Sequence, residues 1–402
     1  MANVSSSNGI EKYPLLRFNG YNNPWMTQKL GDLGTFIKGA PLSKADISNE
    51  GNPFVLYGEL YTTYSEVTHS VKRKTDKTVE QQFYSKIGDV IMPTSGETPE
   101  DIATASCIML PDVILAGDLL IYRTEQIDGR FVSYAIKNKV NKQISSVAQG
   151  KSVVHVRADE LAKICITFPA LDEQKKILNL LELLDTRIAT QQSLIETLKK
   201  YKRGVILKLL NGTLAFDSCS DMELKRVGDF CEVQMCKRIF KEQTTPIGEV
   251  PFYKIGTIGG KPDAYITRTL YDEYRKKYSF PRKGEFLISC AGTVGKCVLY
   301  NGEDSYFQDS NIVWLRNNSE EVTNEYLYML VSNVDWSTLN STTITRIYND
   351  NLRDLSFYIP PVSTQKKITS FIFFLMRRID FEQEMLEGFL QEKAGLLQQL
   401  FI

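Results

Sequence analysis

The segment LDEQKKILNLLELLDTRIATQQSLIETLKKYKRGVILKLLNG, residues 171–212, decides the fold because the chain contains a second copy of it. That copy, STQKKITSFIFFLMRRIDFEQEMLEGFLQEKAGLLQQLFI, occupies residues 363–402. Pro169 aligns with Pro360, a shift of 191 residues, and the same shift holds without a gap from His155 onward. Self-similarity at a fixed shift is the signature of a repeated architecture, so we interpret the chain as two related halves.

Each copy predicts one long helix. Asp172 and Ser363 fall at the same repeat position, follow a proline-containing lead-in, and are residue types that favour the N-cap of a helix. Apolar residues then alternate at spacings of four and three, which is typical of a coiled-coil seam. The seam is interrupted at the same two places in each copy, by Gln191 and Lys202 in the first and by Glu382 and Lys393 in the second.

These interruptions suggest how the two helices pair. In an antiparallel pair, the numbers of facing residues add up to a constant, and pairing Lys202 with Glu382 and Gln191 with Lys393 gives 584 in both cases. A total of 577, one heptad away, would set all four polar groups against apolar partners, which is costly for a buried charge. We therefore predict an antiparallel coiled coil with two polar layers. The alternative is that each amphipathic helix packs on its own domain.

The rest of the chain predicts two related globular domains. Leu119–Arg123 matches Ile312–Arg316 as a buried strand, and Phe131–Asn138 matches Tyr326–Asn333 as a short amphipathic helix. We expect an α+β fold with two β-rich domains separated by two long antiparallel coiled-coil helices, with a pseudo-two-fold internal repeat. The predicted boundaries are residues 1–168 for the first domain, 169–212 for the central helix, 213–224 for a linker, 225–358 for the second domain and 359–402 for the C-terminal helix.

Composition limits the possible functions. The 402 residues include 48 Lys and Arg and 48 Asp and Glu, so DNA binding would have to depend on local patches. Two histidines and seven cysteines without a CxxC pair predict reduced thiols and no zinc site. The sequence also contains no run of about 18 apolar residues and no hydrophobic signal core at its start, so we expect a cytoplasmic protein with no membrane partner.

Parts of three catalytic motifs occur in the sequence, and each motif is incomplete. Asn23-Pro24-Trp25 and Asn52-Pro53-Phe54 have one proline each where amino-methyltransferases have two. Gly292–Lys296 lacks the spacing of a phosphate-binding loop, which favours a β-loop-β turn. Pro262-Asp263 with Glu273 lacks the remainder of a nuclease carboxylate set. We therefore predict a binding protein that is not an enzyme and needs no cofactor.

Candidate DNA contacts are cationic clusters and Ser/Thr/Gly loops that occur in both halves. Cations bind phosphates, and Ser, Thr and Arg side chains read base edges. The clusters are Lys72, Arg73, Lys74 and Lys77 in the first half and Arg275, Lys276 and Lys277 in the second. The loop candidates are Thr94, Ser95, Glu97 and Thr98 in the first half and Thr293 and Lys296 in the second. The alternatives are solvated surface for the clusters and structural turns for the loops.

Several segments, taken in order, resemble the specificity (S) subunit of type I restriction–modification systems. They are Pro14–Phe18 with Trp25, Lys29–Asp32, Ile91–Thr98 with Glu100–Ile102, Ala148–Gly150 before His155, Ser289–Gly295, and the two Pro-x-x-x-x-Gln-Lys-Lys-Ile helix starts. Each motif alone is weakly specific, but their order and duplication cover nearly the whole chain. Cys290-Ala291 stands where the family often has Arg-Ser, so the two domains are expected to read different sequences.

The resemblance implies two target-recognition domains that each read one half of a split, asymmetric site in double-stranded DNA. The helices would fix the unread spacer and dock two methyltransferase (M) subunits, which methylate adenine with S-adenosylmethionine. Restriction (R) subunits would join the complex and cleave unmodified DNA with ATP. None of this catalysis would belong to the present chain. The main alternative is a coiled-coil scaffold protein that does not read DNA, and a methyltransferase or nuclease is disfavoured by the missing motifs.

Overall fold

The computed structural model describes residues 2–3, 13–148, 150, 153–210, 222–336 and 346–402. Most of the predicted linker, residues 213–224, and Gln149 of the resemblance lie outside the described residues. The chain divides into two compact units. The first unit contains Met1–Gln192 and Glu384–Ile402, and the second contains Ser193–Gln383.

The first unit contains two main sheets. A five-stranded sheet has the order β4-β12-β8-β10-β6, and a three-stranded sheet has the order β11-β5-β7. Their strands are β4 (Gly34–Lys38), β5 (Asn52–Leu56), β6 (Val67–Thr68), β7 (Arg73–Thr75), β8 (Asp89–Pro93), β10 (Ser106–Ile108), β11 (Ile114–Ala116) and β12 (Leu119–Thr124). All four residue pairs that β12 and β8 form across the ladder are apolar and buried, so this antiparallel pair forms the centre of the larger sheet.

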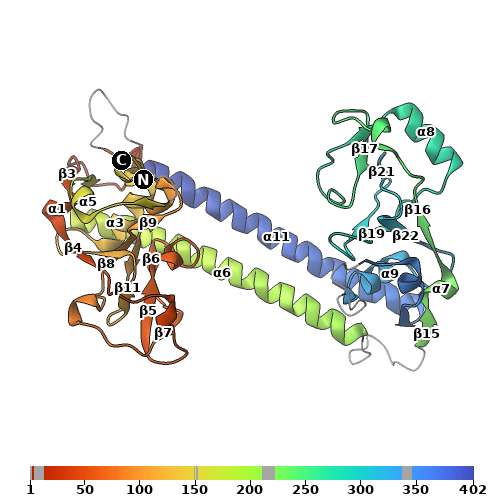
Figure 1. The fold of residues 1–402 in the computed structure, drawn as a ribbon, viewed down its shortest axis with the longest axis horizontal. Coiled ribbons are helices and arrows are strands. Elements are labelled where there is room, and N and C mark those ends of the chain that lie inside the picture. Colours follow the sequence, from red (N-terminus) through yellow and green to blue (C-terminus); the bar gives the residue numbers. More distant parts are fainter. Residues whose placement is uncertain (1, 4–12, 149, 151–152, 211–221, 337–345) are drawn as a thin grey trace. The chain divides into compact units, whose positions relative to one another are not determined.

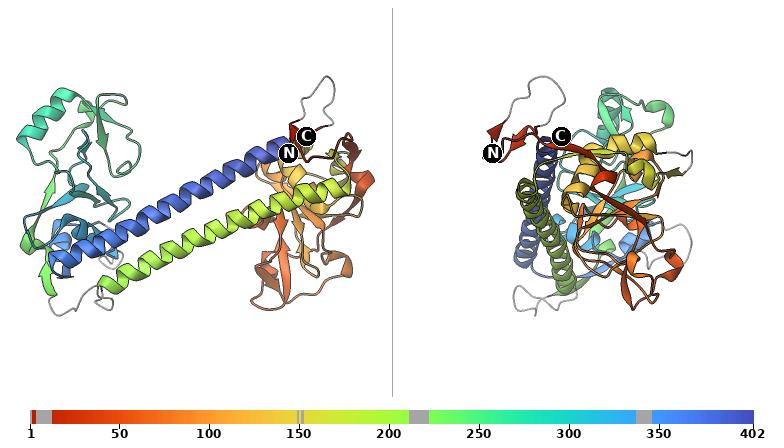
Figure 2. Two further views of the ribbon diagram at one scale, coloured as in Figure 1. Left: turned by 180° about the vertical axis from the view of Figure 1, so that it is seen from behind. Right: turned by 90° about the vertical axis from the view of Figure 1, so that its left-hand side faces the viewer.

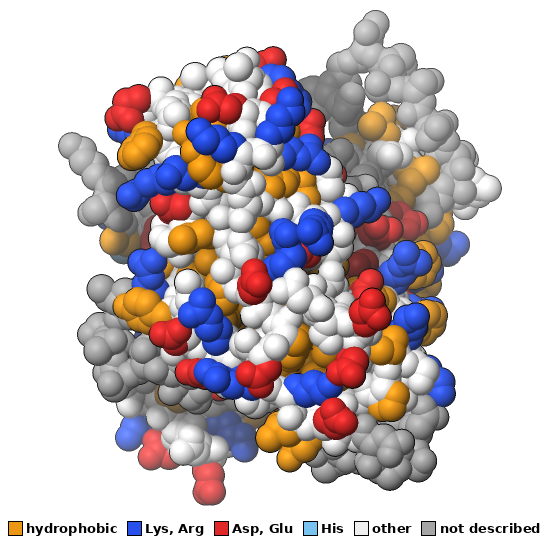
Figure 3. All heavy atoms as spheres, turned by 90° about the vertical axis from the view of Figure 1, so that its right-hand side faces the viewer, with side chains coloured by type: hydrophobic (Ala, Val, Ile, Leu, Met, Phe, Trp, Pro, Cys, Tyr) orange, Lys and Arg blue, Asp and Glu red, His pale blue; other side chains and the backbone are white. Residues whose placement is uncertain are grey.

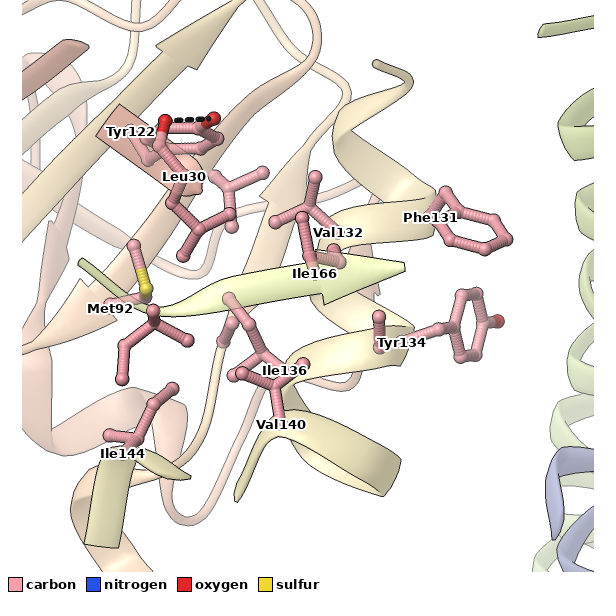
Figure 4. Packing of buried hydrophobic residues seen from close by; sticks show 14 of the residues in the cluster. Leu30, Met92, Tyr122, Phe131, Val132, Tyr134, Ile136, Val140, Ile144 and Ile166 are labelled. Carbon is pink, nitrogen blue, oxygen red and sulfur yellow. Dashed lines mark hydrogen bonds between the residues drawn. The ribbon is translucent and has the colours of Figure 1, made fainter. Parts of the chain in front are cut away.

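Short elements surround these sheets. They are β1 (Ala2–Asn3), β2 (Leu16–Arg17), β3 (Met26–Lys29), α1 (Leu30–Leu33), β9 (Ser95–Gly96), α2 (Pro99–Ile102), α3 (Gly129–Ala135), a π-helical turn (Ile136–Val140), α4 (Asn141–Val147), β13 (Val154–His155), α5 (Ala158–Leu161) and β14 (Cys165–Phe168). Figure 4 shows Leu30, Ile136 and Ile166 from three of these segments converging with Met92 of β8 in one apolar cluster. At the edge of this cluster the Tyr122 hydroxyl donates a hydrogen bond to the Leu30 carbonyl.

The second unit repeats this plan. Its four-stranded sheet has the order β16-β22-β19-β20, and its three-stranded sheet has the order β18-β17-β21. The elements are β15 (Glu223–Arg226), α7 (Val227–Phe230), β16 (Cys231–Met235), β17 (Val250–Tyr253), β18 (Tyr265–Ile266), α8 (Arg268–Lys277), β19 (Phe286–Ser289), β20 (Cys297–Leu299), β21 (Tyr306–Phe307), β22 (Ile312–Asn317), α9 (Asn324–Val331), α10 (Asn349–Arg353) and β23 (Ser356–Ile359). β22 and β12 confirm the two predicted buried strands, and α9 and α3 confirm the two predicted short helices.

A repeated ion pair connects neighbouring strands in each unit. In the first unit the Arg123 guanidinium at the end of β12 lies 2.7 Å from the Asp89 carboxylate at the start of β8. Arg123 also donates to the carbonyl of Tyr84 at 3.1 Å. The second unit has the equivalent contacts, from Arg316 to Glu285 at 2.6 Å and to the carbonyl of Phe280 at 2.8 Å. Both edges of these guanidinium groups are therefore used within the fold.

Two long helices follow the globular parts of the units. They are α6 (Leu171–Leu210), with 40 residues, and α11 (Val362–Leu400), with 39 residues. Both begin one residue before the predicted caps, so Asp172 and Ser363 lie in the first turn instead of at the N-cap. The first free backbone N–H groups donate to the preceding carbonyl of Ala170 or Pro361, which explains the earlier start.

A buried glutamine fixes the start of each long helix. Gln174 is fully buried, and its amide nitrogen donates to the carbonyl of Pro169 at 2.8 Å. Its amide oxygen accepts from the backbone N–H of Asp128, the N-cap of α3, at 3.0 Å. One side chain therefore joins the proline lead-in, the long helix and the short helix. These contacts give a structural reason for the glutamine in the repeated Gln-Lys-Lys-Ile sequence.

We expect Gln365→Ala to lower the free energy of unfolding of the second unit by about 2–3 kcal/mol. Gln365 makes the same contacts as Gln174, donating to Pro360 at 2.8 Å and accepting from the backbone of Thr323 at 2.8 Å. Its removal leaves buried polar groups without partners. Urea denaturation measures the change, and Lys366→Ala, at an exposed neighbouring position, serves as the control. Equal effects of the two substitutions would contradict this role.

In each unit, the segments of α6 and α11 lie side by side and run in opposite directions (Figures 1 and 2). Ile177, Leu181 and Leu400 belong to one buried cluster of the first unit. Ile206 and Ile372 belong to one buried cluster of the second unit. Each helix thus packs both against the other helix and into the cores of both units, so the prediction of paired helices is confirmed and the alternative of separate packing is not.

The predicted register of the pair is wrong in the first unit. Lys393 Nζ lies 2.6 Å from the Asp185 carboxylate, and the guanidinium of Arg187 lies 4.2 Å from the centre of the Phe389 ring. The residue numbers of these pairs add up to 578 and 576, which fits the register near 577 that the sequence argument rejected. Lys393 therefore does not face Gln191.

The reason is that a segment far away in the sequence supplies a partner for Lys393. Glu66, directly before β6, lies 3.1 Å from Lys393 Nζ, so the lysine is paired without a polar residue in the facing seam. In the second unit Glu382 forms an ion pair with Arg378 of its own helix. Lys202 lines a hollow with Ile372 and Met376, and the residue numbers of these pairs add up to 574 and 578, which fits the register near 577 instead of the predicted Lys202–Glu382 layer.

Candidate functional site

The first predicted cationic cluster lies on and around β7, an edge strand of the three-stranded sheet. Lys72, Lys74 and Lys77 are exposed. Arg73 differs from them, because its Nε donates to the buried Glu59 carboxylate at 2.9 Å. The three lysines are suited to mobile phosphate contacts, while Arg73 is held in one orientation.

The second predicted cluster lies in the last turn of α8. Lys276 and Lys277 are exposed. Arg275 lies 3.2 Å from the Asp304 carboxylate and over the rings of Tyr271 and Phe280, so its guanidinium is already partnered within the fold. Two free lysines at a helix C-terminus remain available for an external anion.

The two clusters do not occupy equivalent places, contrary to the sequence interpretation. β7 pairs with β5, and β18 pairs in the same way with β17, so β18 is the counterpart of β7. The second cluster instead lies on α8, a helix that follows β18. The two clusters have similar positions in the sequence only because the segments before them differ in length. In the fold, the two domains carry these cations on different elements.

The loop Thr94–Thr98 is mainly structural. Ser95 is buried, and its hydroxyl lies 3.2 Å from the Asp118 carboxylate. The Thr98 hydroxyl accepts from the backbone N–H of Asp101 as the N-cap of α2. These contacts argue against base reading by Ser95 and Thr98, whose side chains face inward or cap a helix. Glu97 is exposed, and Thr94 is partly exposed.

The segment Gly292–Lys296 is the connection of the β19–β20 hairpin, as the β-loop-β alternative predicts. Thr293 and Lys296 are exposed in this turn. Lys296 Nζ donates to the carbonyl of Ile258 at 2.6 Å, which ties the hairpin to the loop after β17. Gly295 has a φ of 79° and packs against Trp336 so closely that a Cβ would lie 2.1 Å from the ring. The glycines here serve packing and backbone geometry.

A hollow of about 710 Å³ with a mixed apolar and polar lining lies beside Arg73 in the first unit. The loop after β4 contributes Leu42–Ala45, and the end of β5 with its following turn contributes Leu56–Glu59. Asp118, two residues after β11, lies at the same hollow. Three strand ends therefore place a fixed arginine beside open space large enough for a planar group the size of a nucleobase.

A network of charged side chains connects the C-terminal part of α11 to other elements of the first unit. Lys393 lies between Glu66 and Asp185, and Lys137 lies 3.2 Å from Glu66 on its other side. Burial raises the pKa of Glu66, but Lys393 and Lys137 lower it by more, so the net pKa lies below its usual range. Burial lowers the pKa of Lys393, but the two carboxylates raise it above its usual range. This buried network holds α11 in place.

Sequence reasoning missed this network, the repeated Arg–carboxylate pairs and the hollow. For the repeated pairs and the buried glutamines a signal existed, because polar residues recur at matching places within apolar segments of both halves. The sequence contains no such signal for the Glu66 contact or for the hollow, because both are formed by loops that come together only in the folded chain.

The described surface carries mixed charges. On the face shown in Figure 3, Lys and Arg side chains lie interspersed with Asp and Glu side chains. Within the described part of the chain no group of three or more His, Cys, Asp or Glu residues is placed to hold a metal ion, and six cysteines are free thiols. No described helix is long and apolar enough to cross a membrane.

Comparisons with known proteins agree with this architecture. The model of the type I restriction modification DNA specificity domain matches residues 22–200 and 219–388, one match in each half. A solved structure of the S subunit of a type I restriction–modification system from Mycoplasma genitalium superposes with a TM-score of 0.59, covering 97% of this chain and 99% of that one. Its sequence identity is 18%, so this likeness concerns the fold.

Two curated relatives match parts of the sequence. A putative type I restriction enzyme specificity subunit of Haemophilus influenzae is 39% identical over 252 residues, which are 62% of this chain and 64% of that protein. A type I restriction enzyme specificity subunit of Methanocaldococcus jannaschii is 25% identical over 265 residues, 63% of this chain and 60% of that protein. The matches thus span slightly less than two thirds of these relatives. With both halves matched by the family model, the chain belongs to the family of type I restriction–modification DNA specificity subunits.

Proposed function

We propose that this protein is the non-catalytic DNA-reading subunit of a cytoplasmic type I restriction–modification complex. Each globular domain reads one half of a bipartite, asymmetric site in double-stranded DNA. The long helices set the unread spacer and dock two M subunits, and R subunits join through the complex. Methylation and cleavage are carried out by those partners.

The repeated framework with unequal surfaces is the observation that carries this proposal. Both units keep the same central strands, the same Arg–carboxylate pair and the same buried glutamine. Their cations, by contrast, lie on different elements, β7 in one unit and α8 in the other. Two copies of one framework with different contact groups are suited to reading two different half-sites.

The helix lengths support a role in spacing. Forty helical residues extend over about 60 Å at 1.5 Å per residue. Sites on one face of B-DNA recur about every 34 Å. Helices of this length are sufficient to hold two reading domains one or two turns of DNA apart.

Exposed apolar side chains on the helices support the docking of two identical partners. Leu183 on α6 is 68% exposed, and Phe374 on α11, at the equivalent repeat position, is 64% exposed. Contiguous exposed apolar patches mark interaction sites, whereas single exposed apolar residues are common, so the recurrence of these two at one repeat position is what supports the proposal. One such position on each helix gives one docking face for each of two M subunits.

The central experiment is to co-express the chain with its M subunit and to map methylated adenines across a genome. We expect a two-part motif with a fixed gap. Replacing residues 1–168 with the equivalent domain of another family member should change one half of the motif and leave the other unchanged. Absence of methylation, or a continuous palindromic motif, would count against the proposal and favour the coiled-coil scaffold without DNA reading.

We expect Leu183→Asp to remove one M subunit from the complex and Phe374→Asp to remove the other. A buried carboxylate at an apolar contact costs several kcal/mol, so each substitution should weaken its docking face at least about tenfold. Mass photometry of the purified complex measures the number of M subunits bound. The matched controls are Gln192→Asp and Gln383→Asp, also exposed and at equivalent repeat positions. Two M subunits bound by the double variant would contradict these docking faces.

A further inference from the structure

Two arginines, one in each unit, combine an Nε contact to a shielded carboxylate with a side chain that is partly or largely exposed. Arg73 Nε donates to Glu59 Oε1 at 2.9 Å, and Arg238 Nε lies 3.1 Å from Asp309 Oδ2. In both, the carboxylate is largely shielded, with 5% of the Glu59 side chain and 16% of the Asp309 side chain exposed. The arginine side chains are 39% and 68% exposed.

The Nε contact leaves the far edge of each guanidinium available. For Arg73 and Arg238 the described contacts of the guanidinium to oxygen acceptors involve Nε. Arg123 differs, because its Nε and Nη2 bind Asp89 and its Nη2 also binds a carbonyl. Arg123 is thus occupied on both edges, while Arg73 and Arg238 present Nη1 and Nη2 outward.

The acidic partner of Arg73 is itself held by the backbone. Glu59 Oε2 accepts from the N–H of Leu56 at 3.1 Å, and Tyr64 contributes its hydroxyl to Oε1 at 3.5 Å. A carboxylate fixed in this way orients the arginine before any ligand arrives. Such preorganisation reduces the conformational entropy lost on binding.

The surroundings of the two pairs involve corresponding strands of the two domains. In the first unit the hollow beside Arg73 is formed by the loop after β4 and by Asp118, two residues after β11. In the second unit Arg238 lies in the loop after β16, and Asp309 lies two residues after β21. β16 and β21 are the counterparts of β4 and β11 in strand order. Asp309 and Asp118 thus follow corresponding strands, while the two arginines lie on different elements.

We propose that Arg73 and Arg238 each read a guanine in the major groove, one in each half-site. Two parallel N–H donors match the O6 and N7 acceptors of guanine, and no other base offers two acceptors in that arrangement. A lysine supplies charge but no such fork. This inference rests on the proposed function, and it changes the role of Arg73 from a phosphate contact to a specificity-determining residue.

The test is selection of DNA from a randomised duplex library by the purified complex with M subunits, followed by sequencing. We expect the motif selected by the wild-type complex to contain one guanine in each half. Selection of the first guanine should require Arg73, and selection of the second should require Arg238. Arg73→Lys should reduce the preference for its guanine at least about tenfold in the first half-site alone, and Arg238→Lys should do so in the second alone. Glu59→Gln, which keeps an acceptor for Leu56, should weaken the first preference to a smaller extent.

The controls separate base reading from phosphate binding and from folding. Lys74→Gln and Lys241→Gln, at exposed neighbouring positions, should weaken binding to all sequences and leave the motif unchanged. Thermal melting identifies any variant that fails to fold, and Arg73→Gln and Arg238→Gln then replace it. A wild-type complex that selects no motif would overturn the proposed function itself. A recovered motif that stays the same in the arginine variants would overturn this inference and leave the proposed function intact.

Discussion

Replacing Lys393 with Met should lower the free energy of unfolding of the first unit by about 3 kcal/mol. The ammonium group lies 2.6 Å from Asp185 and 3.1 Å from Glu66, and 14% of the lysine side chain is exposed. Removing one partner of a buried ion pair leaves the other charges uncompensated in a region of low dielectric. Lys137 still contacts Glu66 at 3.2 Å, which places the expected loss at the lower end of the range for such pairs.

The matched control is Lys202→Met, which removes the same charge at the equivalent repeat position. Lys202 lies beside Ile372 and Met376 in a hollow of about 140 Å³. Glu325 lines the same hollow, the described ion pairs do not join it to Lys202, and a methionine fits the apolar neighbours. We expect a change of less than about 1 kcal/mol. Urea denaturation of both variants provides the comparison, and equal losses would contradict the network.

The effect of Lys393→Met should also depend on pH. The folded pKa of Glu66 lies below its usual value of 4.5, so its contribution is present above pH 4.5 and is lost as pH falls through the folded pKa. The folded pKa of Lys393 lies above its usual value of 10.5, so its contribution is present below pH 10.5 and is lost as pH rises through the folded pKa. The stability difference between wild type and variant should therefore be constant near neutrality and shrink as pH falls below 4.5 and through the folded pKa of Glu66. A difference that stays unchanged over the whole acid range in which the protein remains folded would exclude Glu66 as the partner.

The sequence predicted the repeated elements well because their signals are local. Leu119–Arg123 and Ile312–Arg316 are apolar runs of strand length, and both are buried strands of the fold. The long helices have a sustained heptad pattern, and both are helical over the predicted length with their starts shifted by one residue. Periodicity shows which face of a helix or strand is buried, and this local information is sufficient to predict these elements.

The wrong predictions all needed a contact between distant segments. The helix register was chosen by pairing seam residues with one another, but Glu66 reaches Lys393 from a loop more than 300 positions earlier. The cationic clusters were taken as equivalent from their spacing, whereas one lies on β7 and the other on α8. Ser95 was predicted to be an accessible loop residue, but its hydroxyl donates a hydrogen bond to the Asp118 carboxylate. None of these partners has a local signature in the sequence.

Phe401→Ala should destabilise the first unit by about 3–4 kcal/mol and leave the second unit unchanged. The Phe401 ring is buried and lies 4.9 Å from the ring of Phe131 and 6.4 Å from that of Tyr134, both on α3. Figure 4 shows these two α3 side chains pointing the same way, away from Ile166. Truncation removes a large aromatic group from this cluster and leaves a cavity, which accounts for most of the expected cost.

Hydrogen–deuterium exchange read by mass spectrometry separates the two units. In Phe401→Ala, exchange of the α3 peptide should accelerate about a hundredfold, since about 3 kcal/mol corresponds to that factor when exchange requires opening of the unit. Exchange of α9, the counterpart of α3 in the second unit, should not change. Phe374→Ala is the control, because it removes an exposed phenylalanine from α11 and should leave both peptides at the wild-type rate. Equal acceleration in α3 and α9 would show instead that the two units unfold together, and that α11 couples them more strongly than its separate contacts require.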